Sequence, residues 1–294
     1  MKENLIANLY LAGWRLVRLL PEKSAYSIAY KVADFLTKRN GKSVARLRSN
    51  LKRTQPNITS FDLELLTIRA MRSYMRYWCD TFRFPDWSKQ RIEKTVTVEN
   101  EHLLMDAIAA KTGVIVSLPH AGNWDHAGAY FCLKGVKLVT VAEHLKPEKL
   151  FQKFLQHRES MGMEVLPLDG RVLGVLAQRL REGALVALVA DRDLSRTGIN
   201  VNFFDGPARM PAGPALLAIK TSSPLITAFV SYTEQGIHID FKQVVLPDLT
   251  NQQEMVSEIV QMTAQNFEDG VREHPEDWHM LQRIWIDGDF QERN

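Results

Sequence analysis

The sequence places a histidine and an aspartate where acid–base chemistry is expected. His120 follows the apolar run 113–118, and Asp125 comes five residues later. An apolar run of this length predicts a buried strand, whose carboxyl end is where ligands reach open α/β sheets. Because imidazole titrates near neutral pH, His120 could act as a general base, and the carboxylate of Asp125 could orient it.

Further polar side chains follow two other predicted strands, at 136–141 and 185–190. The first strand leads to Glu143 and His144. The second leads to two carboxylates and a guanidinium, which belong to Asp191, Arg192 and Asp193. Because the carboxyl ends of parallel strands meet at one edge of a sheet, we expect these groups to converge with His120.

A metal centre is the competing interpretation of the same side chains. The competent ligands are His120, Asp125, His126, Asp191 and Asp193. Their spacing differs from the His-Glu-x-x-His pattern, and the two cysteines, Cys79 and Cys132, form no closed zinc site. We therefore predict no metal and no cofactor. No Gly-x-Ser-x-Gly nucleophile motif and no glycine-rich phosphate loop occurs either.

The pattern of apolar residues predicts two parts within one domain, 1–294. Residues 1–90 form a helical N-terminal layer that could face a membrane, with helices at 4–20, 24–39, 42–53 and 60–82 (N-cap Ser60). Residues 91–294 form an α/β core in which strands and helices alternate. Strands are expected at 96–98, 113–118, 136–141, 164–166, 185–190, 225–232 and 237–245, and helices at 123–133, 147–161, 171–181, 214–222 and 251–272. This order predicts a mostly parallel central sheet with an antiparallel edge, flanked by helices.

Positive charge is concentrated at the N-terminal end. Residues 1–60 contain twelve lysines and arginines and three acidic residues, so their net charge is +9, and since the whole chain carries +3 the remainder carries −6. A basic end suits an anionic membrane surface. The helix at 4–20 could lie in that surface or cap the core. The helix at 60–82 carries a basic stripe that is either solvated or binds phosphate, made of Arg69, Arg72, Arg76 and Arg83.

The sequence also excludes several classes of protein. No nucleic-acid partner is expected, because zinc-finger spacing and RNA-binding signatures are absent. No apolar stretch reaches the 18–20 residues or so that a spanning helix needs, and no signal-peptide cleavage site follows the first apolar segment. We therefore expect a peripheral protein on the cytoplasmic side of the membrane.

Several blocks together resemble a known family. His120-x4-Asp125 is similar to the His-x4-Asp/Glu motif of bacterial glycerolipid and lipid A acyltransferases. The segments 203–213 and 274–282 resemble later blocks of the lipid A acyltransferase superfamily, and the segments 12–21 and 73–83 resemble its phosphatidylinositol mannoside acyltransferases. The resemblance covers nearly the whole chain.

The resemblance implies roles for individual residues. His120 would be the general base and Asp125 its carboxylate partner, while Glu143 and Arg158 would lie near the substrates. The segment 191–193 would line the site.

Two further details follow from the same resemblance. Either Asp191 or Asp193 could supply a second carboxylate to His120, and Arg192 between them would also line the site. Backbone N–H groups of the turn Gly122-Asn123-Trp124, or Arg158, would stabilise the oxyanion.

The implied reaction is transfer of a long-chain acyl group from acyl-CoA to a mannose hydroxyl of a phosphatidylinositol mannoside, at the cytoplasmic face of the plasma membrane. Two alternatives remain open. The acceptor could be a lipid A precursor or a lysophospholipid, with acyl carrier protein as the donor. The chain could also be a lipid-binding protein at a membrane surface that does not catalyse a reaction.

Overall fold

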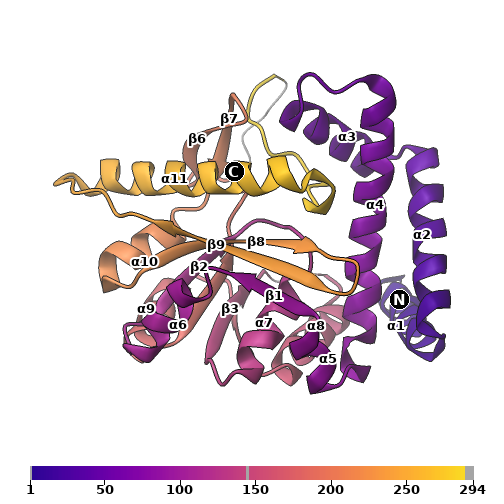
Figure 1. Cartoon of the computed structure of the whole chain (residues 1–294), viewed down its shortest axis with the longest axis horizontal. Helices are drawn as coiled ribbons and strands as arrows, with labels where there is room; N and C mark the ends of the chain where they lie inside the picture. The colour runs from indigo at the N-terminus through magenta and orange to yellow at the C-terminus, as the bar shows by residue number, and fades with distance from the viewer. Residues whose placement is uncertain (1, 144–145, 289–294) are drawn as a thin grey trace.

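The computed structural model describes residues 2–143 and 146–288, and the side chains of residues 2–7 and 9 are outside the description. These residues form an α/β fold built around a central sheet (Figure 1), as the sequence predicts. The described residues hold a central seven-stranded sheet and a separate two-stranded hairpin.

The strand order of the central sheet is β1-β9-β8-β2-β5-β3-β4. The strands are β1 (Val96–Glu99), β2 (Val114–Leu118), β3 (Leu138–Ala142), β4 (Glu164–Pro167), β5 (Leu185–Val189), β8 (Leu225–Tyr232) and β9 (Ile237–Val244). All neighbouring pairs are parallel except β8 and β9. The predicted antiparallel edge is therefore present and consists of two strands, because β1 pairs in parallel with β9.

Helices cover both faces of the sheet. On one face the core is built with α9 (Val172–Arg181), α10 (Gly213–Thr221) and α11 (Gln252–Glu273). On the other face it is built with α5 (Lys89–Lys94), α6 (His102–Ala109) and α7 (Trp124–Leu133), while α8 (Glu148–Ser160) packs beside β4. Val114, Ile115 and Val186 in the middle strands are fully buried, which explains their continuous apolar runs.

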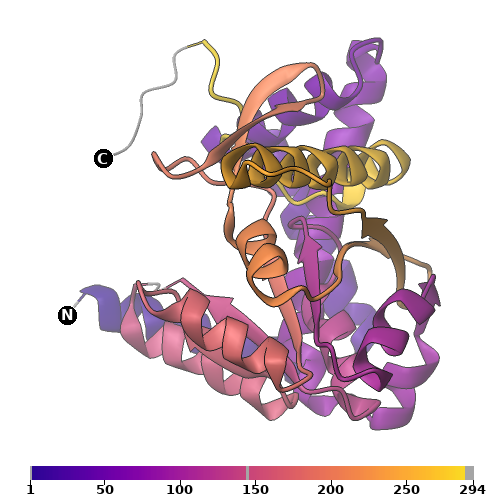
Figure 2. The same ribbon diagram turned by 90° about the vertical axis from the view of Figure 1, so that its left-hand side faces the viewer.

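Several short elements were not predicted. They are α5, α6, the 3₁₀ turns Phe84–Asp86 and Pro275–Asp277, and the antiparallel hairpin β6 (Ile199–Phe203) and β7 (Gly206–Met210). The hairpin lies on the side of α11 that faces away from the central sheet (Figures 1 and 2). Its five-residue strands lack the continuous apolar run by which β2 and β5 were predicted.

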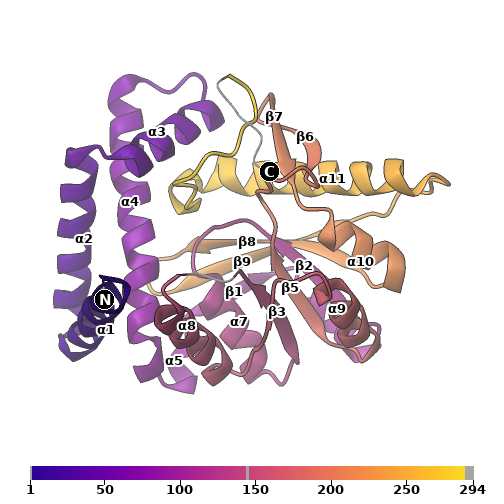
Figure 3. The same cartoon turned by 180° about the vertical axis from the view of Figure 1, so that it is seen from behind.

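The N-terminal helices are α1 (Lys2–Leu19), α2 (Glu22–Arg39), α3 (Lys42–Thr54) and α4 (Ser60–Arg83). The N-cap of α4 is Thr59 rather than the predicted Ser60, since the Thr59 side chain accepts the N–H of Asp62 at 3.1 Å. Helix α4 stands across the end of the sheet and separates it from α2 (Figure 1). Helix α1 lies beside α8 (Figure 3), where Trp14 is buried against Phe154.

Candidate active site

His120 and Asp191 form a hydrogen-bonded pair at the carboxyl ends of two neighbouring strands. Leu118 is the register partner of Val189 in the parallel pair β2–β5, so the residues two positions beyond each strand meet. The Nδ1 atom of His120 lies 2.7 Å from Oδ1 of Asp191. Because an ionised carboxylate only accepts hydrogen bonds, this contact places the proton on Nδ1 and leaves the lone pair on Nε2.

Asp191 is fully buried and receives two more hydrogen bonds. Its Oδ2 accepts the backbone N–H of His120 at 3.1 Å and the indole N–H of Trp278 at 3.0 Å. Burial by itself acts to raise the pKa of the Asp191 carboxyl, but the charge and hydrogen bonds of His120 and the Trp278 donor outweigh burial and lower the pKa. The carboxylate therefore stays ionised beside an imidazole whose side chain is 43% exposed.

Asp125 does not take the place expected for it as the hydrogen-bonding partner of His120. Its Oδ1 accepts the Nε–H of Arg158 at 2.8 Å, and its Oδ2 accepts the hydroxyl of Tyr77 at 3.0 Å. Since Asp125 is the second residue of α7, its side chain is directed to α8 and α4, whereas Asp191 follows a strand adjacent to β2. The hydrogen-bonding partner of His120 is thus Asp191, which the resemblance had offered only as a second carboxylate beside Asp125.

The ion pair of Asp125 and Arg158 is also buried. Burial acts to lower the pKa of Arg158, but the charge of Asp125 and the contacts with Tyr77 raise it instead. Arg158 therefore stays charged, and the pair is largely shielded from solvent, with Arg158 22% exposed and Asp125 6% exposed. This pair joins α7 to α8.

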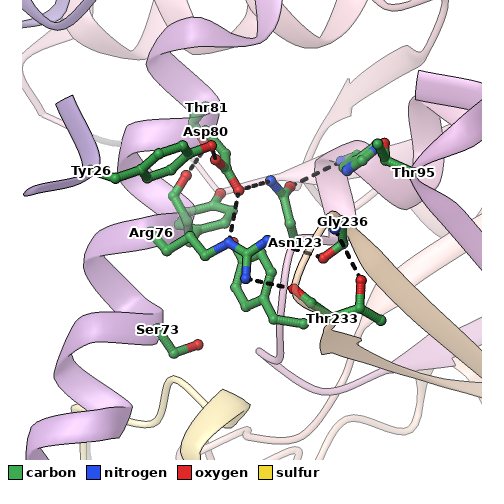
Figure 4. Close-up of polar contacts among 12 residues, drawn as sticks. Tyr26, Ser73, Arg76, Asp80, Thr81, Thr95, Asn123, Thr233 and Gly236 are labelled. Atoms are coloured by element: carbon green, nitrogen blue, oxygen red, sulfur yellow. Dashed lines mark hydrogen bonds and ion pairs between the residues drawn. The ribbon is translucent and has the colours of Figure 1, made fainter. Parts of the chain in front are cut away.

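Asn123 begins α7 and connects it to the N-terminal layer. Its Oδ1 accepts the N–H of His126 at 3.0 Å, and its Nδ2 donates to Oδ2 of Asp80 at 3.5 Å (Figure 4). Asp80 also accepts the hydroxyl of Tyr26 at 2.5 Å, and burial raises the pKa of its carboxyl. The Asn123 side chain is buried. Because it accepts the N–H of His126, it serves as the N-cap of α7.

Trp124 packs beside the His120 ring. Its ring stacks on Tyr77, with centroids 4.4 Å apart, and its plane is nearly perpendicular to the His120 ring at 5.7 Å. Gly122, two residues before Trp124, has φ +55°. It lies so close to Val230 that a Cβ atom at this position would be 2.3 Å from the Val230 carbonyl oxygen. Only glycine fits this turn between His120 and Trp124.

The other residues expected at the site lie in different settings. Glu143 is exposed at the end of β3, and His144 falls outside the described residues. Arg192 is half-buried directly after Asp191. Asp193 closes a turn, since its Oδ1 accepts the N–H of Ser195 at 2.8 Å. Contacts of Glu143, Arg192 and Asp193 with substrate remain predictions.

A C-terminal segment, residues 277–279, completes the site and was not found by reasoning from single residues. The Gly122 N–H donates to the Asp277 carbonyl at 2.9 Å, and the His279 N–H donates to the His120 carbonyl at 2.7 Å. The available signal was the resemblance of residues 274–282 to a family block. The structure explains why residues near the end of the chain belong to the same site as His120, since the two segments are joined by backbone hydrogen bonds.

Three arginines of the basic stripe of α4 make contacts within the protein. Arg72 pairs with Asp34 at 2.7 Å, and Arg76 donates to the carbonyl oxygens of the turn between β8 and β9 (Figure 4). Arg83 donates to the carbonyls at the end of α1. These three arginines bind neighbouring elements, which argues against the phosphate-binding interpretation of the stripe.

Comparison with known proteins then identifies the family. Residues 1–286 match the family described as bacterial lipid A biosynthesis acyltransferase. The chain belongs to this family. This acyltransferase is 38% identical over 280 residues to the phosphatidylinositol mannoside acyltransferase of Mycolicibacterium smegmatis. The matched region covers 94% of this chain and 90% of the M. smegmatis protein. It is also 38% identical over 282 residues to the protein of the same name from Mycobacterium tuberculosis H37Rv. Here the matched region covers 94% of this chain and 87% of the M. tuberculosis protein.

Proposed function

We propose that this acyltransferase moves a long-chain acyl group from acyl-CoA to a mannose hydroxyl of a phosphatidylinositol mannoside. The observation that carries the proposal is the contact of 2.7 Å between the half-exposed His120 and the buried Asp191. A histidine with its lone pair on Nε2 and its Nδ1–H held by a carboxylate has the arrangement of a general base.

The proposed reaction is direct transfer without an acyl-enzyme. Nε2 of His120 takes the proton of the mannose hydroxyl while the hydroxyl oxygen attacks the thioester carbonyl carbon. The tetrahedral intermediate then collapses, the carbon–sulfur bond breaks, and the thiolate takes the proton from the imidazolium. The products are the ester and free CoA, and Asp191 stabilises the imidazolium in between.

Oxyanion stabilisation is assigned to the N-terminus of α7. The Gly122 N–H already donates to the Asp277 carbonyl, and Nε–H of Arg158 donates to Asp125. The N–H groups of Asn123 and Trp124 open the helix and are the donors that we propose, since helix N-termini favour negative charge. In this proposal Arg158 holds Asp125 and lies behind the substrates.

General chemistry supports a thioester donor, and similarity to known acyltransferases supports the proposed acceptor. Attack of an alcohol on an activated thioester needs a base and an oxyanion site but no resident metal or cofactor. The two relatives named above are phosphatidylinositol mannoside acyltransferases. Glu143, Arg192 and Asp193 at the neighbouring strand ends are the side chains that we propose for contact with the substrate headgroups.

We also propose that the protein works as a peripheral protein on an anionic membrane, at the cytoplasmic face of the plasma membrane. The described helices include none that is long and apolar enough to cross a membrane. On α1 and α2, however, large apolar side chains are exposed, namely Leu16, Leu19, Ile28, Val32 and Phe35. Exposed lysines and arginines lie on the same two helices. Apolar residues bordered by basic ones suit an anionic lipid surface.

A panel of donors and acceptors tests the proposed substrates. The purified protein is incubated with palmitoyl-CoA or palmitoyl acyl carrier protein and with phosphatidylinositol mannosides, a lysophospholipid or a lipid A precursor. We expect product only from acyl-CoA and the mannosides. Transfer to another acceptor, or only from acyl carrier protein, would keep the reaction class and overturn the substrate. Absence of any turnover would favour a lipid-binding protein.

A further inference from the structure

The C-terminal segment 277–279 forms hydrogen bonds with the His120 turn and with Asp191. Its backbone bonds to the His120 turn on two sides, through Asp277 O to Gly122 N–H and through His279 N–H to His120 O. Ala121 and Trp278 form an antiparallel β-bridge between these two bonds. The turn that carries His120 is therefore fixed by a segment more than 150 residues further along the chain.

The Trp278 side chain reaches the other member of the pair. Its indole N–H donates to Oδ2 of Asp191 at 3.0 Å, and the residue is completely buried. The ring is fixed by edge contacts with Phe203 and Trp285, with centroids 5.9 and 6.3 Å away. A buried donor in a fixed ring gives the carboxylate one preferred orientation.

The geometry of the Asp191 carboxylate shows what this donor accomplishes. Oδ2 is occupied by two N–H groups, those of Trp278 and the His120 backbone, so Oδ1 is left to face Nδ1 of His120. The indole is a neutral donor. It satisfies the buried carboxylate without supplying a positive charge that would compete with the imidazolium for it.

We infer that Trp278 is a positioning residue of this acyltransferase, whose indole N–H holds Asp191 in the orientation that keeps the His120 lone pair on Nε2. The inference rests on the proposed role of His120 as general base. Trp278 touches neither substrate nor the reacting atoms and acts only through Asp191.

The chain offers a matched control. Trp285 is almost as deeply buried, lies against the same Phe203 ring, and donates its indole N–H to the Phe203 carbonyl at 2.9 Å. Replacing either tryptophan by phenylalanine removes one buried indole donor from the same cluster. Only the change at position 278 removes a donor from Asp191.

The test compares Trp278→Phe with Trp285→Phe in the full-length protein. Both variants should lose thermal stability to a similar degree. We expect kcat to fall roughly 10- to 100-fold for Trp278→Phe, which is the effect of losing a hydrogen bond to a charged group, and to change less than about 3-fold for Trp285→Phe. KM should change little in either variant, because neither tryptophan contacts substrate.

The pH profile separates positioning from general destabilisation. With one donor lost, the Asp191 charge should depend more on the imidazolium, so the acid limb of kcat/KM should move to higher pH in Trp278→Phe alone. Burial, and to a smaller extent the charge of the nearby His120, lower the pKa of His279 to about 3. His279 therefore stays neutral over the pH range of the acid limb. Charged side chains close to the pair in the sequence, or on the segment packed against it, are Asp125, which pairs with Arg158, and Arg192, Asp193 and Asp277.

A spectroscopic measurement keeps the inference testable if Trp278→Phe folds poorly. The indole N–H resonance of Trp278 in the otherwise wild-type fold should shift when Asp191 is replaced by asparagine, and the Trp285 resonance should not. Equal behaviour of the two resonances, or of the two phenylalanine variants, would overturn the inference. Retained activity in His120→Ala would instead overturn the proposed base, whatever Trp278 does.

Discussion

His120 is paired with Asp191 across two adjacent strands, with 2.7 Å between Nδ1 and Oδ1, although Asp125 is far closer in the sequence. We predict that Asp191→Asn lowers kcat by up to about 10⁴-fold, because an amide can present its NH₂ group to Nδ1 and so favour the wrong tautomer of the histidine. Steady-state kinetics with a melting curve checks this. Near-normal turnover in a folded Asp191→Asn protein would contradict it.

Asp125 has a different expected effect. Asp125→Ala leaves Arg158 buried with its carboxylate partner removed, which should cost about 3–5 kcal/mol of the free energy of unfolding. Chemical denaturation of the wild type and the variant measures the difference. The control is Tyr77→Phe, which removes one neutral donor to Asp125 and should cost only about 1 kcal/mol. Equal losses in the two variants would contradict the structural role of the ion pair.

Acid should destabilise the protein through its buried histidines. Burial lowers the pKa of His126 from 6.5 to about 4 and that of His279 to about 3. Below pH 6.5 the unfolded chain binds protons that the folded protein does not, so the free energy of unfolding falls as the pH drops from 6.5 toward 4. The slope approaches about 1.4 kcal/mol per pH unit for each such group.

The check is denaturation at several pH values for the wild type and His126→Gln. The variant should lose part of the slope. Burial raises the pKa of Asp80 and Asp277, and these carboxyls act in the opposite direction, so the informative quantity is the difference between the two proteins. Identical slopes would show that His126 does not contribute.

Membrane binding should depend on the exposed face of α2. Phe35 is 61% exposed between basic residues, and Phe35→Glu should weaken flotation with anionic liposomes by placing a charge against the lipid. Val245 is 66% exposed in the segment that joins β9 to α11, at the opposite end of the molecule from α2 (Figure 1), and serves as control through Val245→Glu. Equal binding by both variants would contradict the proposed surface.

The sequence predicted the fold well where the elements are long helices or continuously apolar strands. The apolar runs at 113–118 and 185–190 became β2 and β5, and polar residues at their ends do converge. The hairpin 199–210 was missed because its strands, which are as short as β2 and β5, lack the continuous apolar run that marked those two strands.

The pairing within the site could not be predicted because it depends on strand order. Nothing local indicates that β5 lies beside β2, and this neighbour relation decides that Asp191, not Asp125, meets His120. Trp278 is also remote in sequence, 87 residues from Asp191. Contacts of this kind become visible only when the register of the sheet is known.

The most direct measurement of the central claim is acyl transfer from palmitoyl-CoA to purified phosphatidylinositol mannosides, by the wild type and by His120→Ala. Mass spectrometry of the lipid product follows the reaction. The account predicts one added acyl chain on the sugar for the wild type and a loss of at least about 10²-fold in the folded variant. Equal product from both proteins would contradict the role of His120 as the base.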